Sequence, residues 1–130
     1  MAVNSINRGV KISPRKVAVV ADLVRGRTVA DALTILDHTP RRSAKAVAET
    51  VKSARANAEH NHGYKPDSLF ISEISVTAGP RFKRYRPAAR GRALRFARKT
   101  SHIHVAVDGE KRASKKPAAA KPKIETEEDS

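Results

Sequence analysis

The stretch that decides the fold runs from residue 79 to residue 99 and reads Gly79-Pro80-Arg81-Phe82-Lys83-Arg84-Tyr85-Arg86-Pro87-Ala88-Ala89-Arg90-Gly91-Arg92-Ala93-Leu94-Arg95-Phe96-Ala97-Arg98-Lys99. It contains nine basic residues, no acidic residue, and three of the five aromatic side chains of the chain. A connection of this length inside a small domain is unusual and is normally functional. It has too few large apolar residues to pack a core, and its charges of one sign repel one another. If extended, it forms a two-stranded arm with its turn near Pro87 to Gly91, which at about 3.3 Å per residue would project roughly 30 Å.

Arginine outnumbers lysine in this arm by seven to two. Guanidinium groups make bidentate contacts with phosphate and stack on bases, and the aromatic rings between them can stack on unpaired bases. This combination favours folded RNA over duplex DNA. The arm could instead be a disordered basic tether that binds nothing in particular, but its position between two predicted strands counts against that. The candidate RNA-binding residues of the arm are Arg81, Lys83, Arg84, Arg86, Arg90, Arg92, Arg95, Arg98 and Lys99.

Two segments with strand patterns flank the arm. Residues 69–77 are rich in β-branched and apolar side chains, and Ile103, Val105 and Val107 alternate with polar residues, which is typical of a half-buried strand. A weaker strand pattern, interrupted by a glycine, covers residues 3–12. The chain therefore has three candidate strands.

Three helices are expected between the candidate strand at residues 3–12 and the candidate strand at residues 69–77. Ser13-Pro14 begins the first, because serine is a good N-cap and proline at the first helical position loses no hydrogen bond. Thr28, with an acidic residue three positions later, begins the second. Thr39-Pro40 is expected to begin a longer third helix, rich in alanine, that ends at Asn61-His62-Gly63. The predicted fold is α+β: three helices packed on a small antiparallel three-stranded sheet, with a long extended β-hairpin.

The length of 130 residues leaves room for one domain. We assign residues 1–109 to a globular body that includes the extended hairpin at about residues 79–100. From Glu110 onward the composition turns to lysine, proline and alanine and closes with acidic residues. Such a segment cannot bury enough apolar surface to offset its ordering entropy, so residues 110–130 are predicted to be a disordered C-terminal tail.

The charge balance points to a polyanionic partner. Lysine and arginine number 27 against 13 aspartate and glutamate, for a net charge of +14. Phosphate is the usual counter-charge for such a protein, although a soluble basic protein or a membrane-surface binder would also fit the charge.

The lack of cysteine excludes disulfides and thiolate metal ligands. Because neither a signal peptide nor a transmembrane stretch is evident, we expect a cytoplasmic protein without a membrane partner.

A second basic group lies at or near the predicted helix ends, where the free N–H groups and dipole of a helix N-terminus also attract phosphate. It comprises Arg15, Lys16, Arg25, Arg27, Arg41 and Arg42, some of which could be ordinary solvated charges.

Two histidine pairs, His60 with His62 and His102 with His104, permit a metal site. No cysteine or acidic cluster supports that idea, so we expect neither a metal nor another cofactor.

Catalytic motifs are missing from the sequence. It has no glycine-rich phosphate loop, no nucleophile elbow and no paired acids in a plausible site, so we expect that the protein is not an enzyme.

The first two predicted helices, joined by Gly26-Arg27, could mimic a helix-turn-helix, which leaves a DNA-binding regulator as an alternative. Against it, the densest charge lies on the arm. An RNA chaperone or remodelling factor is a third possibility.

These residues closely resemble a known family, the bacterial large-subunit ribosomal protein twenty-two. The resemblance runs from about Val10 to Val107. Its markers are Ile12-Ser13-Pro14-Arg15-Lys16-Val17, Val20-Ala21-Asp22-Leu23-Val24-Arg25-Gly26, Ala54-Arg55-Ala56-Asn57-Ala58-Glu59-His60-Asn61, Gly79-Pro80, Lys83-Arg84, Pro87, Ala89-Arg90-Gly91-Arg92-Ala93 and Arg98-Lys99-Thr100-Ser101-His102-Ile103. Tyr85, Arg86 and Phe96 are less typical of the family.

The resemblance implies a structural constituent of the large ribosomal subunit whose body binds ribosomal RNA and assists subunit assembly. It also implies that the hairpin lines the nascent-peptide exit tunnel. Carried over by position, the tunnel-lining residues are Lys83, Arg84, Pro87, Ala88, Ala89, Arg90, Gly91 and Arg92. The implied partners are large-subunit ribosomal RNA, neighbouring ribosomal proteins and the nascent polypeptide, and no homo-oligomer is expected.

Overall fold

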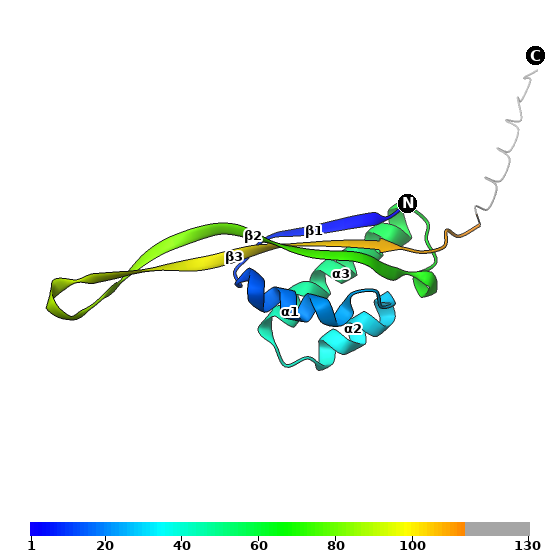
Figure 1. Ribbon diagram of the computed structural model, residues 1–130. Coiled ribbons are helices and arrows are strands. Elements are labelled where there is room, and N and C mark those ends of the chain that lie inside the picture. The colour runs from blue at the N-terminus through cyan, green and yellow to red at the C-terminus, as the bar shows by residue number, and fades with distance from the viewer. Residues whose placement is uncertain (114–130) are drawn as a thin grey trace, which may run out of the picture.

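The computed structural model describes residues 1–113. Three helices pack on one face of a three-stranded antiparallel sheet with the strand order β1-β3-β2 (Figure 1). The elements are β1 (Val3–Val10), α1 (Pro14–Val24), α2 (Val29–His38), α3 (Arg42–Asn61), β2 (Phe70–Pro87) and β3 (Ala93–Asp108). The predicted α+β class, with three helices on a three-stranded antiparallel sheet, is confirmed.

Aliphatic side chains at alternate positions form the face of the sheet that meets the helices. Ile103, Val105 and Val107 of the central strand β3 are fully buried, and Ile71 and Ile74 lie beside them on β2. The helices bury Val17, Val20 and Val24 of α1 and Ala44, Val47, Ala48, Val51, Ala54 and Ala58 of α3. Because four of these six α3 positions are alanine, this helix can approach its neighbours closely.

The strands β2 and β3 continue well beyond this core. They are paired from Phe70 opposite Asp108 to Pro87 opposite Ala93, and the paired strands reach past the helices as a thin ribbon (Figure 1). Every residue from 77 to 99 is exposed or only partly buried. The outer part of the ribbon therefore contributes little to the core, and we call residues 81–99 the hairpin.

A change of register marks the point where the hairpin leaves the body. The pairing shifts by one residue between Ala78 and Arg81, where Gly79 and Pro80 of β2 stand opposite the single residue Thr100 of β3. A side chain at Gly79 would place its Cβ 2.5 Å from Thr100 Oγ1. Such a bulge bends the strand and increases its twist, so it can aim the hairpin away from the helices.

A five-residue turn closes the far end of the hairpin. The N–H of Ala88 donates to the carbonyl oxygen of Arg92 at 2.8 Å, and residues 89–91 form a single 3₁₀ turn. Arg90 and Gly91 both have positive φ, of 60° and 69°. Glycine adopts this conformation without strain, whereas arginine adopts it at a small cost.

The predicted start of the third helix was wrong. Thr39 ends α2 instead of capping α3: its N–H donates to Leu36 O at 3.3 Å and its Oγ1 donates to Ile35 O at 2.7 Å. Pro40 lies in the connection, and α3 begins at Arg42 with Arg41 as its N-cap. The other two predicted starts are confirmed, with Ser13 before α1 and with Thr28 Oγ1 accepting from Asp31 N–H at 3.3 Å.

Backbone hydrogen bonds to the body extend slightly past the expected boundary at residue 109. Lys65 N–H donates to Glu110 O at 2.9 Å, and Arg112 N–H donates to Gly63 O at 2.7 Å. Residues 114–130, most of the predicted tail, lie outside the described residues. Among residues 1–113, no helix is both long and apolar enough to cross a membrane.

Candidate nucleic-acid interface

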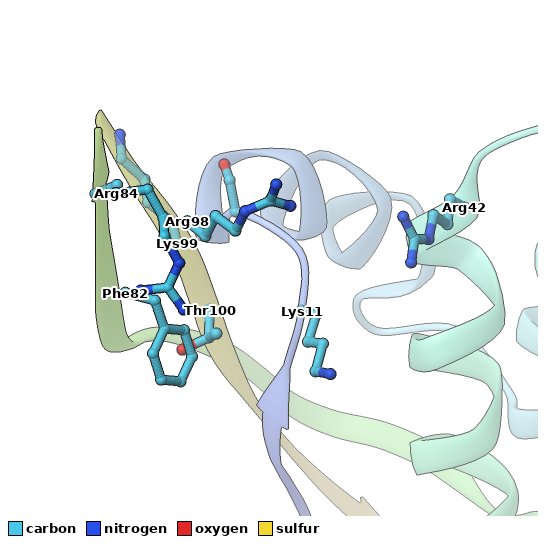
Figure 2. A pocket seen from close by; sticks show the side chains of 9 residues that line it. Lys11, Arg42, Phe82, Arg84, Arg98, Lys99 and Thr100 are labelled. Carbon is cyan, nitrogen blue, oxygen red and sulfur yellow. The ribbon is translucent and has the colours of Figure 1, made fainter. Parts of the chain in front are cut away.

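A hollow of the surface lies where the hairpin joins the body. It has a volume of about 610 Å³ and separates the root of the hairpin from the start of α3 (Figure 2). Its lining comprises Lys11, Ser13, Arg42, Phe82, Arg84, Ala97, Arg98, Lys99 and Thr100. We call it the root groove. Five of these nine side chains are cationic, and within the described residues no carboxylate lines it.

A second hollow of about 360 Å³ continues the root groove toward the helices. It shares Lys11, Ser13 and Arg42 with the root groove and adds Ile12, Lys16, Arg41 and Ser43. The N-termini of α1 and α3 meet here, since Ser43 Oγ donates to Lys16 O at 3.4 Å. In the part of the chain that the structure describes, the first turns of both helices lack acidic residues. The two helix dipoles therefore add to the positive potential of the side chains.

One side of the hairpin alternates arginine with large apolar side chains. Because side chains of directly opposed residues share a face, the register places Phe82 with Arg98, Arg84 with Phe96, and Arg86 with Leu94. Each pair joins one arginine to one apolar residue. The Arg86 guanidinium also lies 5.6 Å from the centroid of the Phe96 ring, in cation–π contact. We call this the mixed face; its Phe82, Arg84 and Arg98 line the root groove.

The opposite face of the hairpin carries four cations and one aromatic side chain. Here Arg81 opposes Lys99, Lys83 opposes Ala97, and Tyr85 opposes Arg95. The Arg95 guanidinium lies 6.0 Å from the Tyr85 ring centroid. Like charges placed directly opposite one another, as Arg81 and Lys99 are, destabilise an isolated pair of strands. A polyanion that surrounds the hairpin would remove this penalty.

The sequence-predicted basic residues fall into two groups. Lys16, Arg41 and Arg42 line the connected hollows, and Arg15 is exposed on the first turn of α1. Arg25 and Arg27 lie at the other end of α1 and contact the body. The Arg25 guanidinium binds Ile74 O at 3.1 Å and Asp22 at 3.0 Å, and Arg27 Nε donates to Leu23 O at 3.0 Å. Arg25 thus ties α1 to β2 and Arg27 caps α1, while both residues stay exposed.

Sequence reasoning missed Lys11 and Lys45. Lys11 follows β1 and lines both hollows, and Lys45 lies with Lys11 and Arg42 along a third, adjoining one. The packing of β1 against α3 brings Lys11 and Lys45 together beside Arg42, and of the two only Lys11 also lines the root groove. The one local signal was the position of Lys11 directly before the Ile12-Ser13-Pro14 helix start.

The remaining predicted residues form the outer half of the hairpin. Arg86 to Arg92 surround the turn, and nearly all of them are exposed. Arg84 Nη1 donates to the neighbouring Lys83 O at 2.8 Å. Of the positions expected to line a tunnel, Pro87 to Arg92 lie together at the turn, away from the helices (Figure 1). Lys83 and Arg84 lie nearer the body, and Arg84 lines the root groove.

Two of the histidines that permitted a metal site, His102 and His104, lie within the sheet. His102 Nδ1 accepts a hydrogen bond from Gly9 N–H at 3.1 Å and so joins β3 to the irregular end of β1. His104 opposes Ile6 and Ser75. In residues 1–113 there is no group of three or more side chains suited to hold a metal ion.

Comparisons with known proteins agree with this geometry. The family model described as ribosomal protein L22p/L17e matches residues 5–108. The large ribosomal subunit protein uL22 of Herpetosiphon aurantiacus is 48% identical over 108 residues, which cover 83% of this chain and 96% of the relative. The uL22 of Oceanobacillus iheyensis is also 48% identical, over 111 residues that cover 85% of this chain and 98% of the relative. The chain therefore belongs to the ribosomal protein L22p/L17e family, whose members are structural, non-enzymatic proteins of the large ribosomal subunit.

Proposed function

We propose that this protein binds large-subunit ribosomal RNA in the cytoplasmic ribosome, assists assembly of the subunit, and lines the nascent-peptide exit tunnel with its hairpin. The observation that carries the proposal is the hairpin itself. It is exposed on both faces, contains nine basic residues and no acidic one, and opposes Arg81 with Lys99. A ribbon of this kind becomes favourable when phosphate surrounds it on both faces.

The body supplies a second surface for the same RNA. The root groove and the hollow beside it bring Lys11, Lys16, Arg41 and Arg42 next to Arg98 of the hairpin. RNA that follows the hairpin inward would therefore also meet cations at its root. This arrangement fits one continuous polyanion that embraces both parts of the molecule, as folded ribosomal RNA does.

The outer half of the hairpin is narrow enough to reach into a confined space. From the bulge to the turn it has seven paired residues a side, from Arg81 opposite Lys99 to Pro87 opposite Ala93. At about 3.3 Å each, they give a reach of roughly 23 Å. Its turn presents Arg90 and Arg92 in exposed positions. Here side chains could contact both the RNA wall of a tunnel and a nascent polypeptide passing through it.

We propose that neighbouring ribosomal proteins contact an apolar surface of α1. Val19 and Leu23 lie one helical turn apart on α1 and are 49% and 46% exposed. This pair is suited to a protein contact, because apolar side chains gain from being covered. We propose that the protein acts as a single copy within the particle.

The DNA-binding alternative is weakened by the composition of α2, which would be the recognition helix of a helix-turn-helix. This helix contains Asp31 and Asp37 and has neither lysine nor arginine. A recognition helix in the major groove would carry those carboxylates toward DNA phosphate. The positive charge is equally compatible with an RNA chaperone. An experiment is therefore needed to distinguish a chaperone from a ribosomal protein.

Two measurements test the proposed function. The full chain is expected to bind large-subunit ribosomal RNA fragments more tightly than duplex DNA at every salt concentration; equal affinity for both would contradict the proposal. It is also expected to sediment with large subunits at moderate salt. A remodelling factor should wash off under these conditions, so loss of cosedimentation would favour the chaperone.

A further inference from the structure

Phe82 occupies an unusual position for a phenylalanine. It lies in β2 opposite Arg98, is 46% exposed, and belongs to the lining of the root groove. No core residue surrounds it, because the buried cluster ends nearer the helices at Val76 and Ile103. Figure 2 shows its ring on the hairpin side of the groove, with Lys11 and Arg42 on the other side.

The other two aromatic rings of the hairpin differ from Phe82 in one respect. The Phe96 ring is in contact with the Arg86 guanidinium and the Tyr85 ring with the Arg95 guanidinium, at 5.6 and 6.0 Å. Across residues 1–113, no cation lies over the Phe82 ring in this way. The ring is 46% exposed and lines the groove, so a planar ligand in the groove could stack on it.

The groove around Phe82 has the size and charge for a nucleotide. Its volume of about 610 Å³ falls within the roughly 300–1,000 Å³ of small-molecule sites. Its cations come from three separate parts of the chain: Lys11 after β1, Arg42 at the start of α3, and the hairpin. Base–aromatic stacking combined with cationic contacts to the backbone is the usual means of binding single-stranded nucleic acid.

We propose that the root groove holds one unpaired nucleotide of RNA, with its base stacked on Phe82 and its flanking phosphates on Lys11, Arg42 and Arg98. The inference rests on the proposed function and assigns a ligand class to one place within it. A double helix would leave the ring without a partner, since its bases are already stacked on one another. Phe82 thus selects unpaired bases over paired ones, whereas the cations of the groove bind the phosphates of single-stranded and double-stranded RNA alike.

The test uses the full chain and a short single-stranded RNA with one 2-aminopurine, a base whose fluorescence falls when it stacks. The same RNA annealed to its complement is the duplex probe. The variants are Phe82→Leu, which removes the ring, and Phe82→Trp, which restores a larger one. Phe70→Leu is the matched control, because Phe70 lies at the body end of the same strand and is 42% exposed.

The Phe82→Leu variant is expected to bind the single-stranded probe about tenfold more weakly, as loss of one stacked base implies, and to lose the fluorescence quench. Its affinity for the duplex should change less than twofold. Its slope of log K against log salt should stay the same, because that slope counts phosphate contacts. Phe82→Trp should restore both affinity and quench, and Phe70→Leu should behave as the wild type.

Three outcomes would overturn the inference: unchanged single-strand binding in Phe82→Leu, an equal loss on the duplex, or an equal loss in Phe70→Leu. Stronger binding of an acidic peptide than of the RNA probe, lost in Phe82→Leu, would assign the groove to a protein partner. Wild-type binding to ribosomal RNA fragments is measured in parallel. If it is normal while Phe82→Leu has no effect, only the groove assignment fails; if it is absent, the proposed function fails.

Discussion

Thr100 on β3 donates a hydrogen bond from its Oγ1 to the carbonyl oxygen of Pro80 on β2, at 2.7 Å. The bond spans the bulge at which the hairpin leaves the body, and Thr100 is only 4% exposed. A single side chain thus satisfies the carbonyl that the irregular pairing would leave without a partner. This contact links the orientation of the hairpin to the rigid sheet.

Thr100→Val should therefore lower the free energy of unfolding. Valine has nearly the shape of threonine but cannot donate, so Pro80 O loses its partner at a cost of about 1–2 kcal/mol. Urea denaturation of the full chain would measure the change. Thr34→Val is the control, because Thr34 Oγ1 donates to Ala30 O on an exposed helix surface, where water can replace it; an equal loss in both variants would contradict the role of the bulge.

Gly79→Ala should be more damaging, by about 1–3 kcal/mol, because the added Cβ overpacks the bulge. The Cβ would lie 2.5 Å from Thr100 Oγ1 and 3.2 Å from His102 Cε1. Combination with Thr100→Ala removes the nearest clashing atom. The double variant should lose less stability than the sum of the two single changes, and strict additivity would show that the two residues do not meet as described.

Deletion of Lys83 to Arg92 should leave the body folded. The core lies between the helices and the inner sheet, and residues 77–99 contain no fully buried side chain. After the deletion, residues 93–97 would form a five-residue loop between Phe82 and Arg98, which is an ordinary hairpin length. Cooperative thermal unfolding, followed by circular dichroism, checks this; a non-cooperative transition would refute the division into body and hairpin.

Charge reversal on the hairpin should impair assembly more than stability. Arg84→Glu and Arg90→Glu replace exposed cations with anions that repel phosphate. Each should change the free energy of unfolding by less than about 0.5 kcal/mol, as exposed substitutions usually do. Sucrose-gradient profiles of large-subunit assembly provide the functional measurement, with Arg84→Lys as the charge-conserving control. Unchanged profiles would count against the hairpin as an RNA-binding element.

Removal of single cations from the root groove should change the salt dependence of RNA binding. Lys11→Gln and Arg42→Gln should each reduce the slope of log K against log salt by about 0.7–0.9, the value for one phosphate contact. Lys52→Gln removes the same charge from a position of α3 that lines neither the root groove nor the hollow beside it. A reduction of the same size in Lys52→Gln would mean that net charge alone controls binding.

The sequence predicted the hairpin region but left its two faces unassigned. The run of basic residues without an acid identified an extended arm, and the glycine and proline residues placed its turn. Which side chains share a face depends on the register, and a slip of one residue moves every side chain to the other face. The five-residue turn between Pro87 and Ala93 sets that register, and with it the pairing of Phe82 with Arg98.

The start of α3 could not be predicted from its neighbouring residues alone. Thr39-Pro40 has the pattern of a helix start, yet the same threonine can end the preceding helix by bonding back to Leu36 and Ile35. Both uses satisfy free backbone groups, so local chemistry does not choose between them. The choice follows from where α2 and α3 must lie to bury their apolar faces.

The sequence by itself determined the class of fold, the acid-free hairpin and the family, because helix starts, strand alternation and charge runs are properties of neighbouring residues. Only the tertiary structure decided that Lys11, Arg42 and Phe82 line one groove, and that Arg25 and Arg27 donate hydrogen bonds to main-chain carbonyl oxygens of the body. The physical reason is that residues far apart in the chain meet through the burial of apolar surface, which is not directional and leaves no local pattern in the sequence.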